Sequence, residues 1–142
     1  MNPENSPAPA DGAKSAEPSP PPISVLLVED DRSVRRYLEV TLQRAGYQVI
    51  TAGDGLAAMR CALTTRVDAV ITDAVMPEMT GQQLARFLRN NPKLAKLPII
   101  LLTGQENDKR LGADKMLIDA FLHKPINSEE LKKCLARLLN SL

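Results

Sequence analysis

The sequence has 142 residues, of which 44% are hydrophobic, so it is long enough for one domain with a substantial apolar core. Its 18 lysines and arginines nearly balance its 17 aspartates and glutamates, which leaves a net charge of +1. A balance this even argues against binding of nucleic acid or of a membrane surface through overall charge. No apolar run is long enough to span a membrane, and no apolar signal core lies near the N-terminus, so we expect a cytoplasmic protein.

Residues 1–22 differ in composition from the rest of the chain. They contain seven of the eleven prolines and no bulky apolar residue after Met1. Such a segment cannot bury enough surface to offset the entropy that it would lose on ordering. We therefore predict a disordered, proline-rich tail over 1–22, followed by one domain over 23–142.

From Ile23 onward, short apolar runs alternate with amphipathic stretches. Length and β-branched content predict strands over 23–28, 48–51, 68–72, 98–102 and 119–123. Helical spacing predicts helices over 33–46, 55–65, 81–91, 105–116 and 127–142. The helix over 105–116 has the weakest pattern, since it has few apolar residues and an internal glycine. Five such β-α units predict an α/β fold, a parallel sheet with helices on both faces.

Local features agree with these helices. Asp31 or Ser33 is placed to cap the first helix, and Gly46 to end it. Asn127 and Glu130 have capping-box spacing at the start of the last helix. The two cysteines, at 61 and 134, form no ligand pattern, and we expect both to be reduced packing residues on helices.

Polar residues stand where four of the predicted strands end. The first strand is followed by Glu29 and Asp30, the third ends at Asp73, the fourth at Thr103 and the fifth at Lys124. In a doubly wound sheet of flavodoxin-like order 2-1-3-4-5, the first and third strands are neighbours. Ligands of such sheets sit beyond the carboxyl ends of the strands, at the point where the strand order reverses. We therefore expect these side chains to converge on one rim.

Charge repulsion limits what this rim can be. Two carboxylates about 5 Å apart repel by roughly 3 kcal/mol at an effective dielectric near 20, so three of them need a cation. Oxygen ligands suit Mg²⁺, for which manganese could substitute, whereas zinc would call for cysteine or histidine. A lysine and a hydroxyl opposite the metal suit a phosphoryl group. With no histidine base at the rim, the natural nucleophile is a carboxylate, which can form an aspartyl-phosphate.

Four motifs in this order resemble those of the receiver domain of two-component response regulators, of the single-domain chemotaxis-regulator type. They are "ED" after "VLLV", "DAVMPEMTG", "LLTG" and "KP", and the resemblance runs from about residue 23 to 139. It implies that Asp73 is the phosphoacceptor. It also implies that Glu29 and Asp30 are the metal-binding pair, and that Asp73 and the backbone carbonyl of Val75 complete the set of metal ligands.

The resemblance further implies a conformational switch. Thr103 matches the switch hydroxyl, Phe121 the aromatic switch position, and Lys124 the lysine that pairs with the phosphoryl group. The bond from Lys124 to Pro125 is then expected to be cis. Phe121 lacks a tyrosine hydroxyl, and the "GAD" usual before the last strand appears as "LID" at 117–119, with a separate "GAD" at 112–114. Because of these departures, the resemblance does not assign the surface that a downstream protein would contact.

The implied function is that of a signalling phosphoacceptor, not an enzyme. A sensor histidine kinase or a histidine phosphotransfer protein would phosphorylate Asp73 with Mg²⁺, and a downstream protein would read the switched face. The resemblance implies no direct contact with nucleic acid or membrane. Two alternatives remain open, a pseudo-receiver scaffold that is never phosphorylated and a phosphate sink in a relay.

Two further alternatives fit the residues poorly. A flavin-binding protein of the same fold needs a phosphate loop of small residues after the first strand, and here that loop is acidic. A phosphatase with an aspartate nucleophile carries a second aspartate two residues later, where this chain has Val75.

Overall fold

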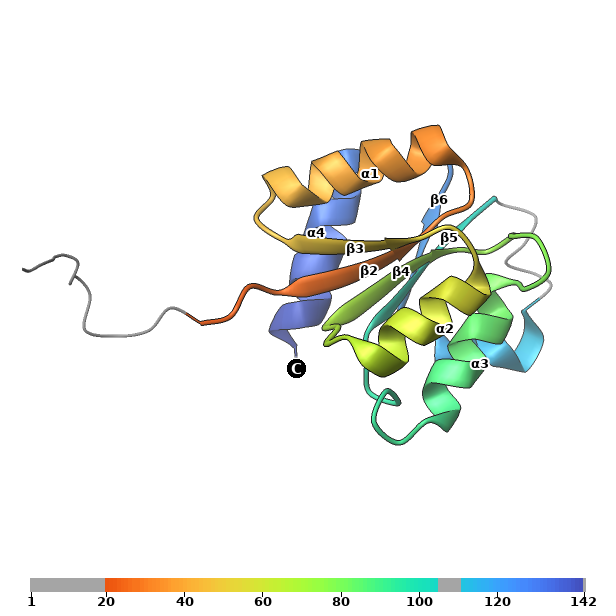
Figure 1. Cartoon of the computed structure of the whole chain (residues 1–142). Coiled ribbons are helices and arrows are strands. Elements are labelled where there is room, and N and C mark those ends of the chain that lie inside the picture. The colour runs from red at the N-terminus through yellow and green to blue at the C-terminus, as the bar shows by residue number, and fades with distance from the viewer. Residues whose placement is uncertain (1–19, 105–110, 142) are drawn as a thin grey trace, which may run out of the picture.

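The computed structural model describes residues 20–104 and 111–141, in which strands and helices alternate along the chain (Figure 1). The strands are β2 (Ser24–Val28), β3 (Gln48–Ala52), β4 (Ala69–Asp73), β5 (Ile99–Thr103) and β6 (Ala120–His123). The helices are α1 (Arg32–Arg44), α2 (Gly55–Thr64), α3 (Gly81–Asn90), the 3₁₀ helix η2 (Gly112–Leu117) and α4 (Ser128–Asn140). Most of the predicted tail, residues 1–19, lies outside the described residues, so the tail and the domain boundary stay predictions.

The five strands form one parallel sheet in the order β3-β2-β4-β5-β6. This is the order 2-1-3-4-5 predicted from the sequence, and it is confirmed. The register aligns the carboxyl ends of the strands: Val28 pairs with Ala52 and Thr72, and Asp73 pairs with Leu102. Residues that follow these strands therefore begin at the same edge of the sheet.

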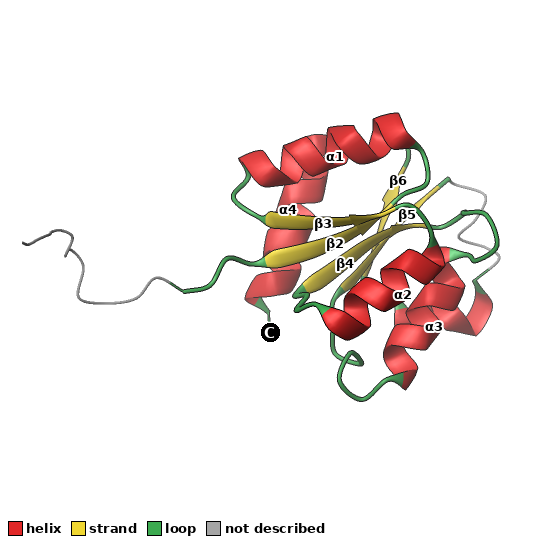
Figure 2. Cartoon of the chain, in the orientation of Figure 1, coloured by secondary structure: helices red, strands yellow, loops and turns green. Residues whose placement is uncertain are grey.

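Helices cover both faces of the sheet (Figure 2). On one face, Val25 and Leu27 of β2 lie in a buried cluster with Leu38 of α1 and Leu131 of α4. On the other face, alternate strand residues such as Leu26 pack in a second cluster with residues of α2 and α3. Every residue of β2, β4 and β5 is buried, as expected for central strands of a parallel sheet.

Residues predicted to cap or end helices α1 and α4 lie at those ends in the structure. The side chain of Asp31 accepts a hydrogen bond from the N–H of Val34 at 2.9 Å and so caps α1. Gly46 follows the end of α1 with φ of 100°, a conformation that glycine adopts at little cost. At the start of α4, the side chain of Asn127 accepts from the N–H of Glu130 at 2.9 Å.

The fourth helical segment differs from the prediction of a helix over 105–116. Residues 105–110 lie outside the described residues, and the described part is the 3₁₀ helix η2. Gly112, with φ of 54°, and the shortage of apolar residues give this segment little tendency toward a regular α-helix. Instead, Asp114 attaches η2 to α3 through hydrogen bonds from Gln82 and Arg86.

Both cysteines lie on helices, Cys61 on α2 and Cys134 on α4, and neither forms a disulfide. This confirms the prediction of free packing thiols. Within 20–104 and 111–141, none of the helices combines the length and the apolar content needed to cross a membrane.

Candidate functional site

Three carboxylates meet at the carboxyl edge of β2 and β4. Glu29 and Asp30 directly follow β2, and Asp73 is the last residue of β4, its neighbour in the sheet. One carboxylate oxygen from each lies within 4.8 Å of the others. Glu29 is 1% exposed and Asp73 is 5% exposed, whereas Asp30 faces the solvent. The structure thus brings the predicted acidic residues together.

Lys124, in the loop after β6, extends over the same carboxylates. Its Nζ lies 2.8 Å from Oδ1 of Asp73 and 3.7 Å from Oε1 of Glu29. Its backbone N–H donates to the carbonyl of Thr103 at 2.9 Å, and its peptide bond to Pro125 is cis, as expected. Burial alone would lower the pKa of Lys124, but the hydrogen bond to Asp73 and the surrounding negative charges outweigh it and raise this pKa. Lys124 is therefore a fixed positive charge at the rim.

Glu29 is the most deeply buried of the three acids. Its Oε2 accepts a hydrogen bond from the backbone N–H of Asp31 at 3.2 Å. Among the described residues, no hydrogen-bond donor reaches its Oε1. Burial, reinforced by the neighbouring charge of Asp73, raises the pKa of Glu29 to about 7. A buried carboxylate oxygen without a donor is a position that a cation would complete.

The donor set decides which cation fits. All the candidate ligand atoms are oxygens, two of the three acids are buried, and within 20–104 and 111–141 one lysine forms ion pairs with them. Mg²⁺ prefers such a site, with few carboxylates and room for water and phosphate oxygens. The pocket of Glu29, Asp30 and Asp73 fits Mg²⁺ and the acceptance of a phosphoryl group.

The loop from β4 to α3 closes tightly beneath Asp73. The N–H of Gly81 donates to the carbonyl of Ala74 at 2.9 Å. A Cβ atom at Gly81 would lie 2.3 Å from the carbonyl oxygen of Asp73, so no other residue fits without a shift of the backbone. Val75, between them, is 58% exposed, and its N–H lies 3.4 Å from Oδ1 of Asp73. The role of its carbonyl as a metal ligand stays a prediction.

The two predicted switch residues lie close to the rim but do not contact the carboxylates in any described hydrogen bond. Thr103, at the end of β5, is fully buried, and its hydroxyl donates to the carbonyl of Gly104 at 2.8 Å. Phe121 is half-buried and packs against the cluster on the α2 and α3 side of the sheet. Nζ of Lys115 lies 5.9 Å from the centre of its ring. Their roles as switch residues stay predictions.

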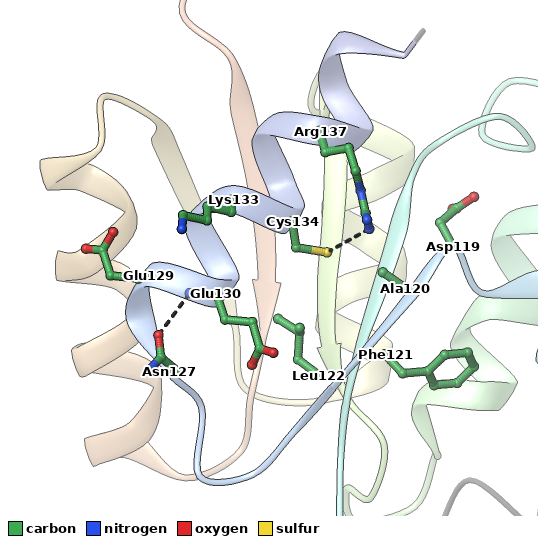
Figure 3. Close-up of a pocket in the computed structure, with 10 residues that line it drawn as sticks. All are labelled: Asp119, Ala120, Phe121, Leu122, Asn127, Glu129, Glu130, Lys133, Cys134 and Arg137. Carbon is green, nitrogen blue, oxygen red and sulfur yellow. Dashed lines mark hydrogen bonds between the residues drawn. The ribbon is translucent and has the colours of Figure 1, made fainter.

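A separate hollow of about 750 Å³ lies between β6 and α4 (Figure 3). Cys134 of α4 accepts a hydrogen bond from Arg137 at 3.8 Å along its wall, and Phe121 points away from α4. None of the three carboxylates lines this hollow, nor does Lys124. The hollow is therefore distinct from the acidic pocket.

The sequence reasoning overlooked Arg35. Its Nη1 donates to the carbonyl of Glu29 at 2.7 Å. The feature that could have revealed it is its place one turn into α1, since long side chains on helices lean toward the N-terminal end. That end of α1 adjoins the acidic pair.

Comparisons with known proteins agree with this geometry. The model of the response regulator receiver domain matches residues 25–136. The chain is 35% identical over 118 residues to the transcriptional regulatory protein GltR of Pseudomonas aeruginosa, which covers 82% of this chain and 48% of GltR. The chain thus spans about half the length of the curated relatives of this kind.

Solved structures show the same similarity. The chemotaxis response regulator CheY4 of Vibrio cholerae is 36% identical, with a TM-score of 0.77 over 83% of this chain and 99% of that one. The response regulator TrrA of Thermotoga maritima, solved in complex with Mg²⁺ and BeF, is 31% identical, with a TM-score of 0.74 over 82% of this chain and 98% of that one. The family match contains the strand ends and the whole acidic pocket. The chain therefore belongs to the response regulator receiver domains, a family of signalling modules.

Proposed function

We propose that Asp73 accepts a phosphoryl group from a phosphohistidine on a sensor histidine kinase or a histidine phosphotransfer protein. The observation that carries this proposal is the contact of 2.8 Å between Nζ of Lys124 and Oδ1 of Asp73 inside the acidic pocket. This contact places a positive charge beside the carboxylate that would become phosphorylated. A charge held there in advance costs no reorganisation when the phosphoryl group arrives.

In the proposed transfer, an oxygen of Asp73 forms a bond to phosphorus while the bond from phosphorus to the imidazole nitrogen breaks. The electron pair of the broken bond stays on the imidazole. Glu29, Asp30, Asp73 and the Val75 carbonyl would hold Mg²⁺, which supplies positive charge to the transferring group. Lys124 would bind an oxygen of the phosphoryl group. Positioning and charge stabilisation carry most of such a transfer, so no further base is needed.

We propose that phosphorylation is read at the face formed by η2, β6 and α4. Thr103 adjoins the pocket at the end of β5, and Phe121 lies on the neighbouring strand. Movement of the Thr103 hydroxyl toward the phosphoryl group would open space for the Phe121 ring and alter this face for a downstream protein. The two free thiols suit the reducing cytoplasm, which is where we place this signalling step.

Labelling with acetyl phosphate and Mg²⁺ tests the proposal. The wild-type chain should become phosphorylated at Asp73, and Asp73→Asn should not, as measured by intact mass. The matched control is Asp54→Asn, which changes an exposed aspartate that caps α2 and leaves an equally good cap. It should label like the wild type. Labelling of Asp73→Asn at the wild-type rate would refute the assignment, and a wild-type chain that never labels would favour the pseudo-receiver scaffold.

A phosphate sink remains the second candidate, and a different measurement separates it. A sink accepts the phosphoryl group but has no partner that distinguishes its two states. The proposed switch therefore requires a partner that binds the beryllofluoride form of the full chain and the unmodified form with different affinities.

A further inference from the structure

The side chain of Arg35 extends from α1 back to the loop that carries the acidic pair. Arg35 is half-buried, and its Nη1 donates to the carbonyl of Glu29 at 2.7 Å. This carbonyl belongs to the peptide group that joins Glu29 to Asp30. The guanidinium group thus holds the peptide from which the exposed member of the pair extends. A charged donor forms one of the stronger hydrogen bonds available to a carbonyl.

Three bonds together fix Glu29. Its N–H donates to the carbonyl of Ala52 on β3 at 3.1 Å, its carbonyl accepts from Arg35, and its carboxylate accepts from the N–H of Asp31. The first joins two backbone groups, and the third joins a backbone N–H to the side chain of Glu29 itself. Arg35 is the one side chain that donates to Glu29 in the described hydrogen bonds.

The guanidinium group has room because of Gly53, which follows β3. A Cβ atom at Gly53 would lie 3.3 Å from Nη1 of Arg35 and 4.0 Å from its Cζ. The first distance is closer than ordinary packing allows, so a side chain here would push against Arg35. The φ of Gly53 lies outside the left-handed region, and its backbone therefore tolerates alanine. Gly53, in the loop after β3, thus leaves room for the side chain that Arg35 extends from α1.

We propose that Arg35 is a positioning residue of the divalent-cation site, which fixes the Glu29–Asp30 peptide in the geometry that binds the metal, and that Gly53 leaves the space it needs. The inference rests on the proposed Mg²⁺ site and adds residues that do not touch the metal. Two effects of Arg35 oppose each other. Its charge repels a cation, so its loss would tighten binding by charge alone, whereas the loss of positioning would weaken binding. Whether the Kd for Mg²⁺ rises or falls when Arg35 is replaced therefore shows which of the two effects is larger.

The test is titration of the full chain with Mg²⁺ by calorimetry. Arg35→Gln should raise the Kd for Mg²⁺ about tenfold, within the range seen when groups that orient metal ligands are removed. Arg35→Lys, which keeps the charge and one donor, should recover part of this loss. Arg36→Gln is the matched control, because Arg36 is an exposed neighbour that pairs with Glu39 at 3.1 Å. It removes the same charge and should leave the Kd within about twofold.

A double-mutant cycle tests whether Gly53 acts through the side chain of Arg35. Gly53→Ala should raise the Kd in the wild-type background and have no further effect in the Arg35→Gln background. Equal effects in both backgrounds would overturn the role of Gly53. If Arg35→Gln folds poorly, Gly53→Ala alone serves as the test, because its added Cβ would press on the guanidinium group of Arg35.

A second measurement separates positioning from general damage. At saturating Mg²⁺, labelling of Arg35→Gln by acetyl phosphate should return to within about threefold of the wild-type rate, because the cation, once bound, restores the ligand geometry. Unchanged or tighter Mg²⁺ binding by Arg35→Gln would overturn the proposal. A wild-type chain that does not bind Mg²⁺ would instead overturn the cation site itself.

Discussion

Two sets of acidic side chains in this molecule are neutralised in opposite ways. Beside η2 and β6, each acid has its own arginine. Asp114 accepts hydrogen bonds from Arg86, and Asp119 lies 2.8 Å from Arg89. Both arginines come from α3, so these pairs fasten the last part of the sheet to its neighbouring helix. Matched pairs of this kind leave no charge for a ligand to compensate.

The acidic pocket has the opposite balance. Among the described residues, Lys124 is the one cation paired with these three carboxylates, and the two most buried acids are the ones that Lys124 contacts. Burial of unmatched charge costs free energy, which the raised pKa of Glu29 expresses. The comparison shows that the acidic pocket differs from the acids beside η2 and β6 because its carboxylates outnumber the basic side chains paired with them.

The largest expected effect follows from removing Lys124, the cation that pairs with Asp73. Lys124→Met should lower the rate of phosphoryl labelling about 100-fold, because a preorganised charge next to the accepting oxygen is lost. Labelling kinetics with acetyl phosphate at saturating Mg²⁺ measure this. Lys132→Met, which breaks the exposed pair between Lys132 and Glu129, is the control and should label normally. A wild-type rate in Lys124→Met would mean that the pocket works without its lysine.

Removing an arginine from the ion pairs beside η2 and β6 should lower the stability of the fold and leave phosphoryl labelling unchanged. Arg89 donates to the carbonyls of Leu117, Ala95 and Leu97 as well as to Asp119. Arg89→Met should therefore lower the free energy of unfolding by about 2–4 kcal/mol, since several acceptors lose their donor. Urea denaturation measures this loss. The labelling rate of the folded protein should stay unchanged, and a fall in that rate would break the distinction between the two sets.

A pH titration should detect the unmatched charge of Glu29 itself. Its pKa is about 7 in the folded state and near 4.5 for an ordinary glutamate, so the metal-free folded state binds the extra proton between these values. The free energy of unfolding should then fall by about 1–3 kcal/mol as the pH rises from 4.5 through 7. Glu29→Gln should remove this part of the decline, as thermal melts across the window would show. An identical pH profile in Glu29→Gln would contradict the raised pKa.

Mg²⁺ binding provides a second test of Glu29, in which the measured affinity should increase with pH while the stability of the metal-free protein decreases. Because the metal needs the ionised carboxylate, Mg²⁺ affinity of the wild-type chain should rise as the pH increases through 7.

The smallest expected effect concerns the pair at η2. Asp114→Asn keeps the shape of the side chain but loses its charge toward Arg86, which lies at the exposed surface. Exposed ion pairs contribute little to stability, so the melting temperature should fall less than in Arg89→Met, and labelling should be unaffected. A larger fall than in Arg89→Met would show that η2 depends on this one carboxylate.

The strands and the acidic pocket were predictable for the same physical reason. Apolar runs such as 24–28 indicate buried strands. The residues that follow parallel strands all lie at the same edge of the sheet. Once the order 2-1-3-4-5 is assumed, Glu29 and Asp73 must lie close together. Their chemistry then follows from charge, without knowledge of any contact distance.

Other parts could not be predicted because they depend on contacts between segments far apart in the sequence. The close approach of Arg35 to Gly53 requires α1 and the loop after β3 at their final separation. The attachment of η2 to α3 through Asp114 joins residues 28 positions apart, and the weak pattern over 105–116 did not indicate it. The Thr103 hydroxyl is a separate, local case, since it donates to the carbonyl of the adjacent Gly104, a choice among nearby acceptors that composition does not reveal.

The close approach of Gly81 to the carbonyl of Asp73 carries a consequence for protein engineering. Copying the three acids and the lysine onto another parallel sheet would transfer the charges but not the close packing of Gly81 against the main chain of Asp73. Any residue larger than glycine at the start of the following helix would press on the main-chain carbonyl of the aspartate. A transplanted acidic site should therefore be built from the segment Asp73 to Gly81 as one unit, with glycine kept at its last position.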